Sequence, residues 1–363
     1  NYNVGSGQVY STITNALTDL NIRGVSAPVT FTLTDATYNA ASGETFPLVL
    51  SAYTNASATN TVTFRPATGT TAEIVNVAAS PVFSFNGGRF YRIDGRQNGV
   101  SNPKSLTVRS DNTAGNAILY INDASDNIIR HSILLGNNTA AAGGVVNFST
   151  GLVTGNDNNT IDSCNLGNSA SIPVTIINAA GSTSNATILN SNNIISNNEV
   201  YNFWNATGES NAFKISNGNT DWTITGNHIY QTAPRTATTG LQNYIWNLNK
   251  GANANALNNM IITNNIIGGS QANAGGAPYT VSGTVAVRFT GAYLDMGTIT
   301  PSLFQNNTYT NFSWTTNDVS TTIPGTWNAV WALSGITSIL NNTIGSMTTN
   351  DAIVITGNAN GGV

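Results

Sequence analysis

Two short patterns of apolar and polar residues alternate along most of the chain. The first reads apolar–x–apolar and ends in Asn, Ser or Thr, and its first and third residues are expected to point inward. This alternation, rich in β-branched and aromatic residues, predicts short strands with one buried face. The copies are Phe83–Asn86, Leu119–Asn122, Val146–Ser149, Phe213–Ser216, Trp246–Asn249, Val287–Thr290, Trp331–Ser334 and Ile353–Thr356.

The second pattern reads apolar–x–Asn–Asn–x–apolar and recurs in phase with the first. Its copies begin at 93, 128, 161, 195, 224, 262, 304 and 339, about 35 residues apart, and the earliest copies have lost the Asn pair. Two patterns that recur together over such a length are typical of a repeat architecture.

The Asn pairs predict corners between strands, because Asn tolerates the left-handed conformation that a sharp corner requires. If successive coils lie about 4.8 Å apart, the amides can form a ladder. In it, each Asn would donate to the Asn of the preceding coil and accept from that of the following coil. The expected ladder residues are Asn197, Asn198, Asn227, Asn264, Asn265, Asn306, Asn307, Asn341 and Asn342.

These features predict an all-β fold, a single-stranded right-handed parallel β-helix of about 9–10 coils. A β-propeller is the main alternative, but an Asn ladder has no role in its blades. At the N-terminus, residues 11–21 form an amphipathic pattern that predicts a short capping helix with Ser11 as N-cap. Residues 1–60 are expected to form a cap that continues into the β-helix of residues 61–363, giving one structural domain.

With this helix ahead of the first strands, the chain resembles the pectin-lyase-like right-handed β-helix superfamily. The segments Tyr2–Gly5, Asn60–Gly69 and Tyr91–Gly95 are similar to those of large secreted surface proteins of Bacteroidetes. The resemblance implies the capped β-helix fold and a place outside the cell. It says little about an activity.

Composition narrows the classes of function. The chain has 56 Asn but only 28 charged residues, with a net charge of −4. Without a basic stripe, nucleic-acid binding is not expected, and no apolar run is long enough to span a membrane. The single Cys164 excludes a disulfide within the chain. Few Lys and many Asn, Thr and Ser suit a secreted or cell-surface bacterial protein.

The C-terminal end of the predicted β-helix has no evident cap. The last strand pattern is followed only by a Gly- and Asn-rich segment, residues 357–363. An uncovered strand edge invites pairing. We therefore expect either a downstream secretion or attachment domain, or self-association through this end into a filament.

One cluster of charged residues is a candidate for catalysis. The corner pattern brings together Asp94, Arg96, Arg130, His131 and Asp162 from three successive copies. A polysaccharide lyase or glycoside hydrolase would use a base, here Arg130 or His131, with carboxylates as acid or cation ligands. Ca²⁺ is conceivable there although no motif supports it, and no cofactor or metal is expected. The structural alternative is that these acids and bases only pair across coils.

The tryptophans supply a second set of candidates. Trp246 and Trp331 fall at inward strand positions and are expected in the core. Trp204, Trp314 and Trp327 lie in longer connecting segments, where exposed rings could stack on sugars. The alternative is that these three rings fold over the coil exterior.

Sparse charge and the ladder favour a secreted, non-enzymatic structural or adhesive β-helix. A polysaccharide-active enzyme that uses the charged cluster is the first alternative. A carbohydrate-binding module without turnover is the second.

Overall fold

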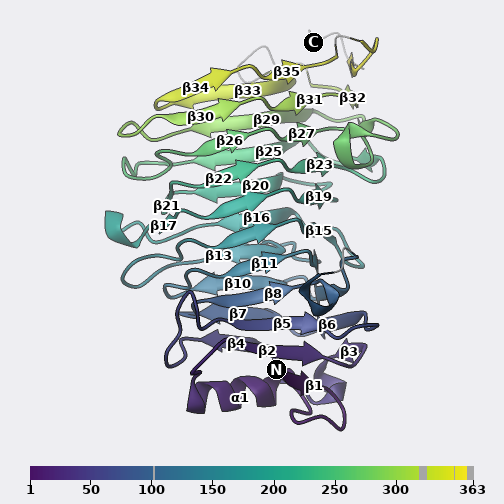
Figure 1. Cartoon of the computed structure of the whole chain (residues 1–363). Helices are drawn as coiled ribbons and strands as arrows, with labels where there is room; N and C mark the ends of the chain where they lie inside the picture. The colour runs from purple at the N-terminus through teal and green to yellow at the C-terminus, as the bar shows by residue number, and fades with distance from the viewer. Residues whose placement is uncertain (101–102, 319–324, 347, 358–363) are drawn as a thin grey trace.

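A computed structural model describes residues 1–100, 103–318, 325–346 and 348–357. It confirms the predicted right-handed parallel β-helix (Figure 1). Each full coil contributes one strand in turn to three parallel sheets, here named sheet A, sheet B and sheet C. The coil cross-section is therefore three-sided, which the sequence patterns had not indicated.

Sheet A consists of β1 (Tyr2–Val4), β2 (Val29–Leu33), β5 (Val62–Pro66), β8 (Tyr91–Asp94), β11 (Ile128–Arg130), β14 (Thr160–Asp162), β18 (Ile194–Ser196), β22 (Thr223–Thr225), β26 (Ile261–Thr263), β30 (Ser302–Gln305) and β34 (Thr337–Leu340). Sheet B consists of β3 (Thr37–Tyr38), β6 (Ala72–Asn76), β9 (Leu106–Ser110), β12 (Ile133–Gly136), β15 (Asn165–Asn168), β19 (Glu199–Tyr201), β23 (His228–Tyr230), β27 (Ile266–Ile267), β31 (Thr308–Tyr309) and β35 (Thr343–Ile344). Sheet C consists of β4 (Leu48–Ser51), β7 (Phe83–Asn86), β10 (Ile118–Ile121), β13 (Val146–Phe148), β16 (Thr175–Ala179), β20 (Ser210–Ser216), β25 (Leu241–Asn249), β29 (Val287–Asp295) and β33 (Trp327–Ser334).

Smaller elements lie in the segments between these strands. β17 (Asn190–Ser191) pairs with β21 (Asn219–Thr220), and a four-stranded sheet contains β24 (Arg235–Thr236), β28 (Tyr279–Ser282), β32 (Phe312–Thr316) and β36 (Ile353–Gly357). Four short 3₁₀ turns occupy Ala40–Ser42, Gln97–Gly99, Ala186–Ile188 and Ala272–Ala274.

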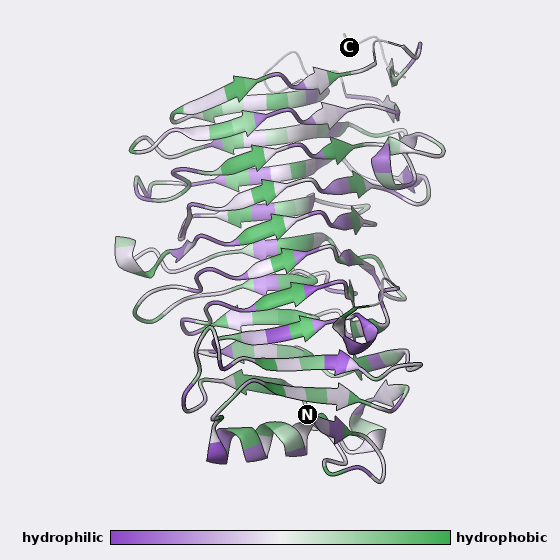
Figure 2. Ribbon diagram, viewed as in Figure 1, coloured by the Kyte–Doolittle hydropathy of each residue, from purple (hydrophilic) through white to green (hydrophobic). Residues whose placement is uncertain are grey.

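The core is a continuous column of apolar side chains inside the three sheets. Figure 2 shows hydrophobic residues alternating with hydrophilic ones along the stacked strands. Phe85, Tyr120 and Phe148 illustrate the stacking, with successive ring centroids 4.7 and 4.4 Å apart. One cluster of buried side chains runs from Val4 to Ala329, so the first strands share their core with the later coils.

Helix α1 (Ile13–Arg23) covers the first coil with its apolar side, which buries Ile13, Leu17 and Leu20. It lies two residues later than predicted, and the Ser11 N-cap was wrong: Thr12 is the N-cap. The Thr12 hydroxyl accepts from the backbone N–H of Asn15 at 3.0 Å. The Glu44 carboxylate also stabilises the start of the helix, because it accepts hydrogen bonds from the backbone N–H groups of Ile13 and Thr14. No helix in the described ranges is long and apolar enough to cross a membrane.

The Asn ladder lies at the corner between sheets A and B and uses the second Asn of each pair. Side-chain amides link Asn198, Asn227, Asn265, Asn307 and Asn342, with Nδ2–Oδ1 distances of 2.9 to 3.1 Å. Each amide nitrogen donates to the following coil, which is the reverse of the predicted direction. The same Oδ1 also accepts a backbone N–H from the preceding coil. Each rung is therefore fully bonded.

The first Asn of each pair forms the left-handed corner that was predicted, but it lies outside the buried ladder to which it was also assigned. Asn197, Asn264, Asn306 and Asn341 have φ between 53° and 59° and form the left-handed corner itself. They face solvent, because the sharp turn points their side chains away from the core. Gly226 takes this place in one coil, which explains the Gly in that copy of the pattern.

Two further ladders lie at the corner between sheets C and A, and neither was predicted from the sequence. One joins Asn127, Asn159 and Asn193, and the other joins Asn156, Asn190 and Asn219. The signal was present as a polar residue and an Asn immediately before the sheet A strand. Trp222 and Met260 replace the Asn in later coils, so the pattern is not continuous.

In two copies of the strand pattern in sheet C, the residues predicted to point inward face outward instead. In β10, Ile118 and Tyr120 are buried, whereas Leu119 and Ile121 turn outward. Trp331 is half-buried and packs edge-on against Tyr293, which also faces outward. A run of several apolar residues leaves the strand register open by one residue, and a shift of one residue exchanges the two faces.

The last described coil leaves apolar side chains exposed, among them Ile339, Leu340 and Ile344 at 42 to 58 %. They adjoin a hollow of about 490 Å³ that is also lined by Trp327. The final residues on which the expectation of an uncapped edge depends, 358–363, lie outside the described residues.

We predict that Asn265→Ala lowers the free energy of unfolding by about 3 kcal/mol, because it leaves buried ladder groups on both neighbouring coils without partners. The matched change Asn264→Gly, at a corner with φ of 59°, should cost less than about 0.5 kcal/mol. Chemical denaturation followed by circular dichroism measures both. Equal losses in the two variants would contradict the structural distinction between them.

Candidate functional site

The predicted charged cluster assembles on the outer side of sheet A. Asp94, Arg130 and Asp162 are direct neighbours in register on β8, β11 and β14. Arg96 follows β8 and donates two hydrogen bonds to the Asp94 carboxylate, each 2.9 Å long. Arg130 donates to the same carboxylate from the next coil at 3.0 Å.

Asp94 is consequently an ion-pair centre and not a free acid. Its side chain is only 1 % exposed. Burial alone would raise its pKa, but the hydrogen bonds from Arg96 and the charge of Arg130 outweigh it, so the pKa lies below its ordinary value. A carboxylate held charged in this way cannot donate a proton near neutral pH.

The other two members of the predicted cluster are also constrained. His131 occupies a corner with φ of 49°, and burial and the charge of Arg96 lower its pKa. Burial tends to raise the pKa of Asp162, but hydrogen bonds from Ser196, Asn197 and Ser163 keep it below the ordinary value. Neither residue makes an ion pair in the part of the chain that the structure describes. The members of the predicted charged cluster therefore do lie near one another. Their contacts form a network of ion pairs and hydrogen bonds between successive coils.

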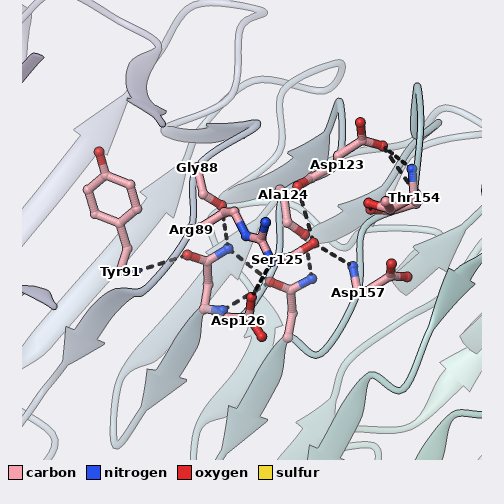
Figure 3. Close-up of polar contacts among 12 residues, drawn as sticks. Gly88, Arg89, Tyr91, Asp123, Ala124, Ser125, Asp126, Thr154 and Asp157 are labelled. Atoms are coloured by element: carbon pink, nitrogen blue, oxygen red, sulfur yellow. Dashed lines mark hydrogen bonds and ion pairs between the residues drawn. The ribbon is translucent and has the colours of Figure 1, made fainter. Parts of the chain in front are cut away.

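A group of three aspartates, not singled out from the sequence, lies at the corner before sheet A (Figure 3). Asp126 pairs with Arg89 at 2.9 Å. Asp123 accepts backbone N–H groups from the segment 152–155. Asp157 accepts the N–H and the hydroxyl of Ser191. Among the described residues, no group of three or more acidic, His or Cys side chains is arranged to hold a metal ion.

Two of the three tryptophans proposed for sugar contact are buried, so the expected exposure was wrong for them. Trp314 is fully buried on β32, and its indole N–H donates to the Val287 carbonyl. Trp204 is 8 % exposed and donates to the Thr236 carbonyl. Trp327 is half-buried and stacks on Phe289 at 5.0 Å. The connecting segments fold inward around these rings because each carries apolar neighbours that need cover.

Other aromatic rings do reach the surface, on the outer side of sheet C. Tyr244, Tyr293 and Trp331 are half-buried and face outward from β25, β29 and β33. Tyr293 lies 6.2 Å from Tyr244 and 4.9 Å from Trp331, both in edge-on geometry. We call these three residues the aromatic row. The row was not predicted from the sequence, because Trp331 was assigned to the inward side and Tyr244 and Tyr293 lie outside the copies of the strand pattern.

Polar side chains extend the same face toward the N-terminal coils. In register, Tyr293 is followed by Asn247, Lys214 and Asn178 on successive strands. Lys214 pairs with Glu209 at 2.8 Å in a hollow of about 190 Å³. The aromatic row and Lys214 thus lie on the same side of sheet C, whereas the amides of Asn247 and Asn178 are buried and bonded within the protein.

A further hollow, of about 310 Å³, lies beside the aromatic row and is lined by Gln242 and Arg288. The Arg288 guanidinium is paired with Asp318 at 3.1 Å. This second concavity is therefore charge-balanced, and its polar groups can serve as hydrogen-bond donors beside the rings.

No protein-family model and no curated protein matches the chain. Among solved structures, it is similar to PfbA, a surface adhesin of Streptococcus pneumoniae. Identity is 13 %, coverage is 93 % of this chain and 87 % of that one, and the TM-score is 0.40. A second PfbA structure gives 12 % identity, coverage of 92 % and 93 %, and a TM-score of 0.38. The Agl-KA catalytic domain gives 12 % identity and a TM-score of 0.41, with 95 % of this chain covering 64 % of that one.

We predict an unusual pH dependence at Asp157. Burial, together with the charges of Asp123 and Asp126, raises its pKa from 3.8 to about 6. The folded protein therefore retains a proton that the unfolded chain releases, so the stability from Asp157 is present below pH 3.8 and is lost as pH rises through about 6. Asp157→Asn keeps the acceptor for Ser191 and removes this loss.

Relative to the unchanged protein, Asp157→Asn should gain about 1–2 kcal/mol between pH 4.5 and pH 8. Denaturation curves of both proteins at the two pH values measure the difference. Because it is taken between the two proteins, the opposite trend from carboxylates of lowered pKa cancels. A constant difference across this range would show that the pKa of Asp157 is not raised.

Proposed function

We propose that the protein is a non-enzymatic, extracellular β-helix that adheres to a neutral polysaccharide through the outer face of sheet C. The observation that carries the proposal is the aromatic row with its neighbouring amide and charged side chains. Aromatic rings that are half-buried and already packed against one another can bury further apolar area on binding with little loss of side-chain freedom. This suits contact with the apolar faces of sugar rings.

The strand spacing favours an extended ligand lying along the β-helix axis. Neighbouring strands are about 4.8 Å apart, so outward residues on successive coils present contacts at regular intervals. Lys214 continues the line of Tyr293 two strands away, and its ammonium group can donate to hydroxyl oxygens. Asn247, on the strand between them, is buried, and its amide donates to Glu209 and Asn211. A polymer passing over the rings toward the N-terminal coils would therefore meet the ammonium group of Lys214.

The contacts of the carboxylates favour binding over hydrolysis. Glycoside hydrolysis commonly needs two carboxyl groups that flank the scissile bond. On the sheet C surface Glu209 is paired with Lys214, and on sheet A Asp94 is paired with two arginines. Each of these carboxylates is bonded to a cation and not paired with a second carboxyl group, which argues against the enzyme alternative.

We also propose that the chain is a pectin-lyase-like β-helix of the cell surface or the extracellular space. The capping helix and the Asn ladders support this relationship, and the low Lys content suits the location. Self-association through the last described coil is also part of the proposal, because Ile339 and Ile344 are exposed there. Helix α1 covers the opposite end of the column, so an end-to-end stack would place this coil against α1 or against the same coil of a second copy.

We predict that Tyr293→Ala and Trp331→Ala each weaken binding to a neutral glycan at least about tenfold, as expected for loss of an aromatic anchor. Affinity electrophoresis in gels that contain neutral glucans, after a glycan-array survey, measures the change. The matched control is Tyr201→Ala, an outward tyrosine of sheet B that stacks on Tyr230 at 5.4 Å; it should bind as the unchanged protein does.

The same samples should release no new reducing ends or unsaturated products from any glycan retained. Product release, abolished by Glu209→Gln or Arg130→Ala, would replace the binding function by an enzymatic one. An equal loss in the Tyr201→Ala control would mean that the face of sheet C is not the binding surface.

A further inference from the structure

Arginine side chains gather on a different face, the outer side of sheet A near its N-terminal end. Arg65 lies on β5, Arg92 on β8, Arg96 directly after β8, and Arg130 on β11. These strands are consecutive neighbours in sheet A. Together the four residues, which we call the arginine surface, hold one third of the 12 Lys and Arg residues of the chain.

Within the described ranges, one carboxylate is bonded to this group. Asp94 accepts from both Arg96 and Arg130. A methyl carbon placed on Gly99 would lie 2.7 Å from Arg65 Nη1 and 3.8 Å from Asp94 Oδ2. Arg65 therefore reaches the rim of the same ion-pair centre without joining it.

Arg65 makes neither a hydrogen bond nor an ion pair within the described residues, and its Nε is buried with no acceptor. A buried donor without a partner costs free energy. The guanidinium of Arg65 is held beside the other arginines without an acceptor among the described residues, so its outer N–H groups remain free to donate to an anion.

Among the described residues, Arg92 donates hydrogen bonds to neutral groups. Its Nη1 donates to the backbone carbonyls of Tyr91 and Asp126, at 3.0 and 2.7 Å. Burial lowers its pKa and the nearby charge of Arg130 lowers it further, whereas the charge of Asp126 acts in the opposite direction. The carbonyls fix the direction of the guanidinium, and no carboxylate of the described residues is bonded to it.

The acids around the arginine surface are engaged elsewhere. Asp126 pairs with Arg89, and Asp162 on the next strand accepts from Ser163, Ser196 and Asn197. Asp123 and Asp157, at the preceding corner, are bonded to backbone amides and to Ser191. Four guanidinium groups thus face one bonded carboxylate, in a chain whose net charge is −4.

We propose that the arginine surface is a docking site for an acidic polysaccharide, which supplies carboxylate or sulfate groups to Arg65 and its neighbours. Guanidinium groups bind such anions through paired N–H donors. Arg130 and Arg96 remain accessible for this, with 42 % and 21 % of their side chains exposed. The site lies on another face from the aromatic row and does not depend on it.

An acidic glycan fits this surface better than a nucleic acid does. Duplex DNA carries one charge per about 1.7 Å of axis and is held by many phosphate contacts. Four arginines on three adjacent strands, bordered by Asp126 and Asp162, offer a short patch with negative charge on both sides. A polymer with one anionic group per sugar can place that group on the patch and its hydroxyls beside it.

The test measures binding of the whole chain to four probes: polygalacturonate, dextran sulfate, uncharged dextran and double-stranded DNA, at low and high salt. We expect binding to polygalacturonate or dextran sulfate that weakens as salt rises, and weaker or absent binding to the other two. The first two probes distinguish a carboxylate ligand from a sulfate ligand, and binding to either supports the proposal.

Arg65→Gln is the decisive variant, because Arg65 makes no hydrogen bond or ion pair with the described residues and its loss should not lower the melting temperature. It should weaken binding to the acidic glycan about fivefold or more, and Arg65→Gln with Arg92→Gln more strongly. The matched control is Arg109→Gln, on sheet B, where the arginine is paired with Glu73 at 2.8 Å; its affinity should not change. Unchanged affinity in Arg65→Gln, tighter binding to DNA than to both acidic glycans, equal binding to uncharged dextran, or no binding at all would each overturn the proposal.

Discussion

The fold depends on hydrogen bonds between buried side-chain amides on successive coils. An amide without partners in an apolar interior is costly, yet Asn198, Asn227, Asn265 and Asn307 are all fully buried. They are tolerated because each one binds the coil before it and the coil after it. The same bonds fix the vertical register of the coils, since a shifted coil would leave both of its neighbours unsatisfied. The Asn content that first distinguishes this chain is therefore placed where it specifies structure.

Because amide ladders stabilise the corners of the later coils, ion pairs are needed only in part of the molecule. Ion pairs such as that of Asp94 with its two arginines reinforce the early coils, where the corner between sheets A and B lacks the ladder. Below Asn198 the ladder ends at Cys164, whose N–H donates to the Asn198 oxygen at 2.8 Å. In the first coils, charged and hydroxyl groups take over what the amides do later. The charged cluster, which the sequence indicated as a candidate catalytic site, lies in the part of the molecule where the ladder is absent and other side-chain bonds replace it.

The three-sided column also places on separate faces residues that alternate along the chain. Every coil passes through sheets A, B and C in turn, so residues about 35 positions apart become neighbours, whereas residues ten positions apart lie on different faces. The aromatic row and the arginine surface are each assembled in this way from successive coils. Two surfaces with different ligand chemistry can thus occupy one rigid column. Their separation follows from the coil geometry and requires no second domain.

The sequence by itself determined the repeat, the parallel β-helix and the capping helix, because each leaves a periodic or local signal: alternation along strands, Asn pairs at corners, an amphipathic run before the first coil. It also brought Asp94, Arg130 and Asp162 into one column, since coil-to-coil register follows from that period. Only the tertiary structure decided which way side chains face where several apolar residues adjoin, as at Leu119 and Trp331, and which long connections fold inward, as at Trp204 and Trp314. It also decided which charges are neutralised. Those outcomes depend on packing between coils and on the three-sided cross-section, and neither is recorded in the order of residues along one strand.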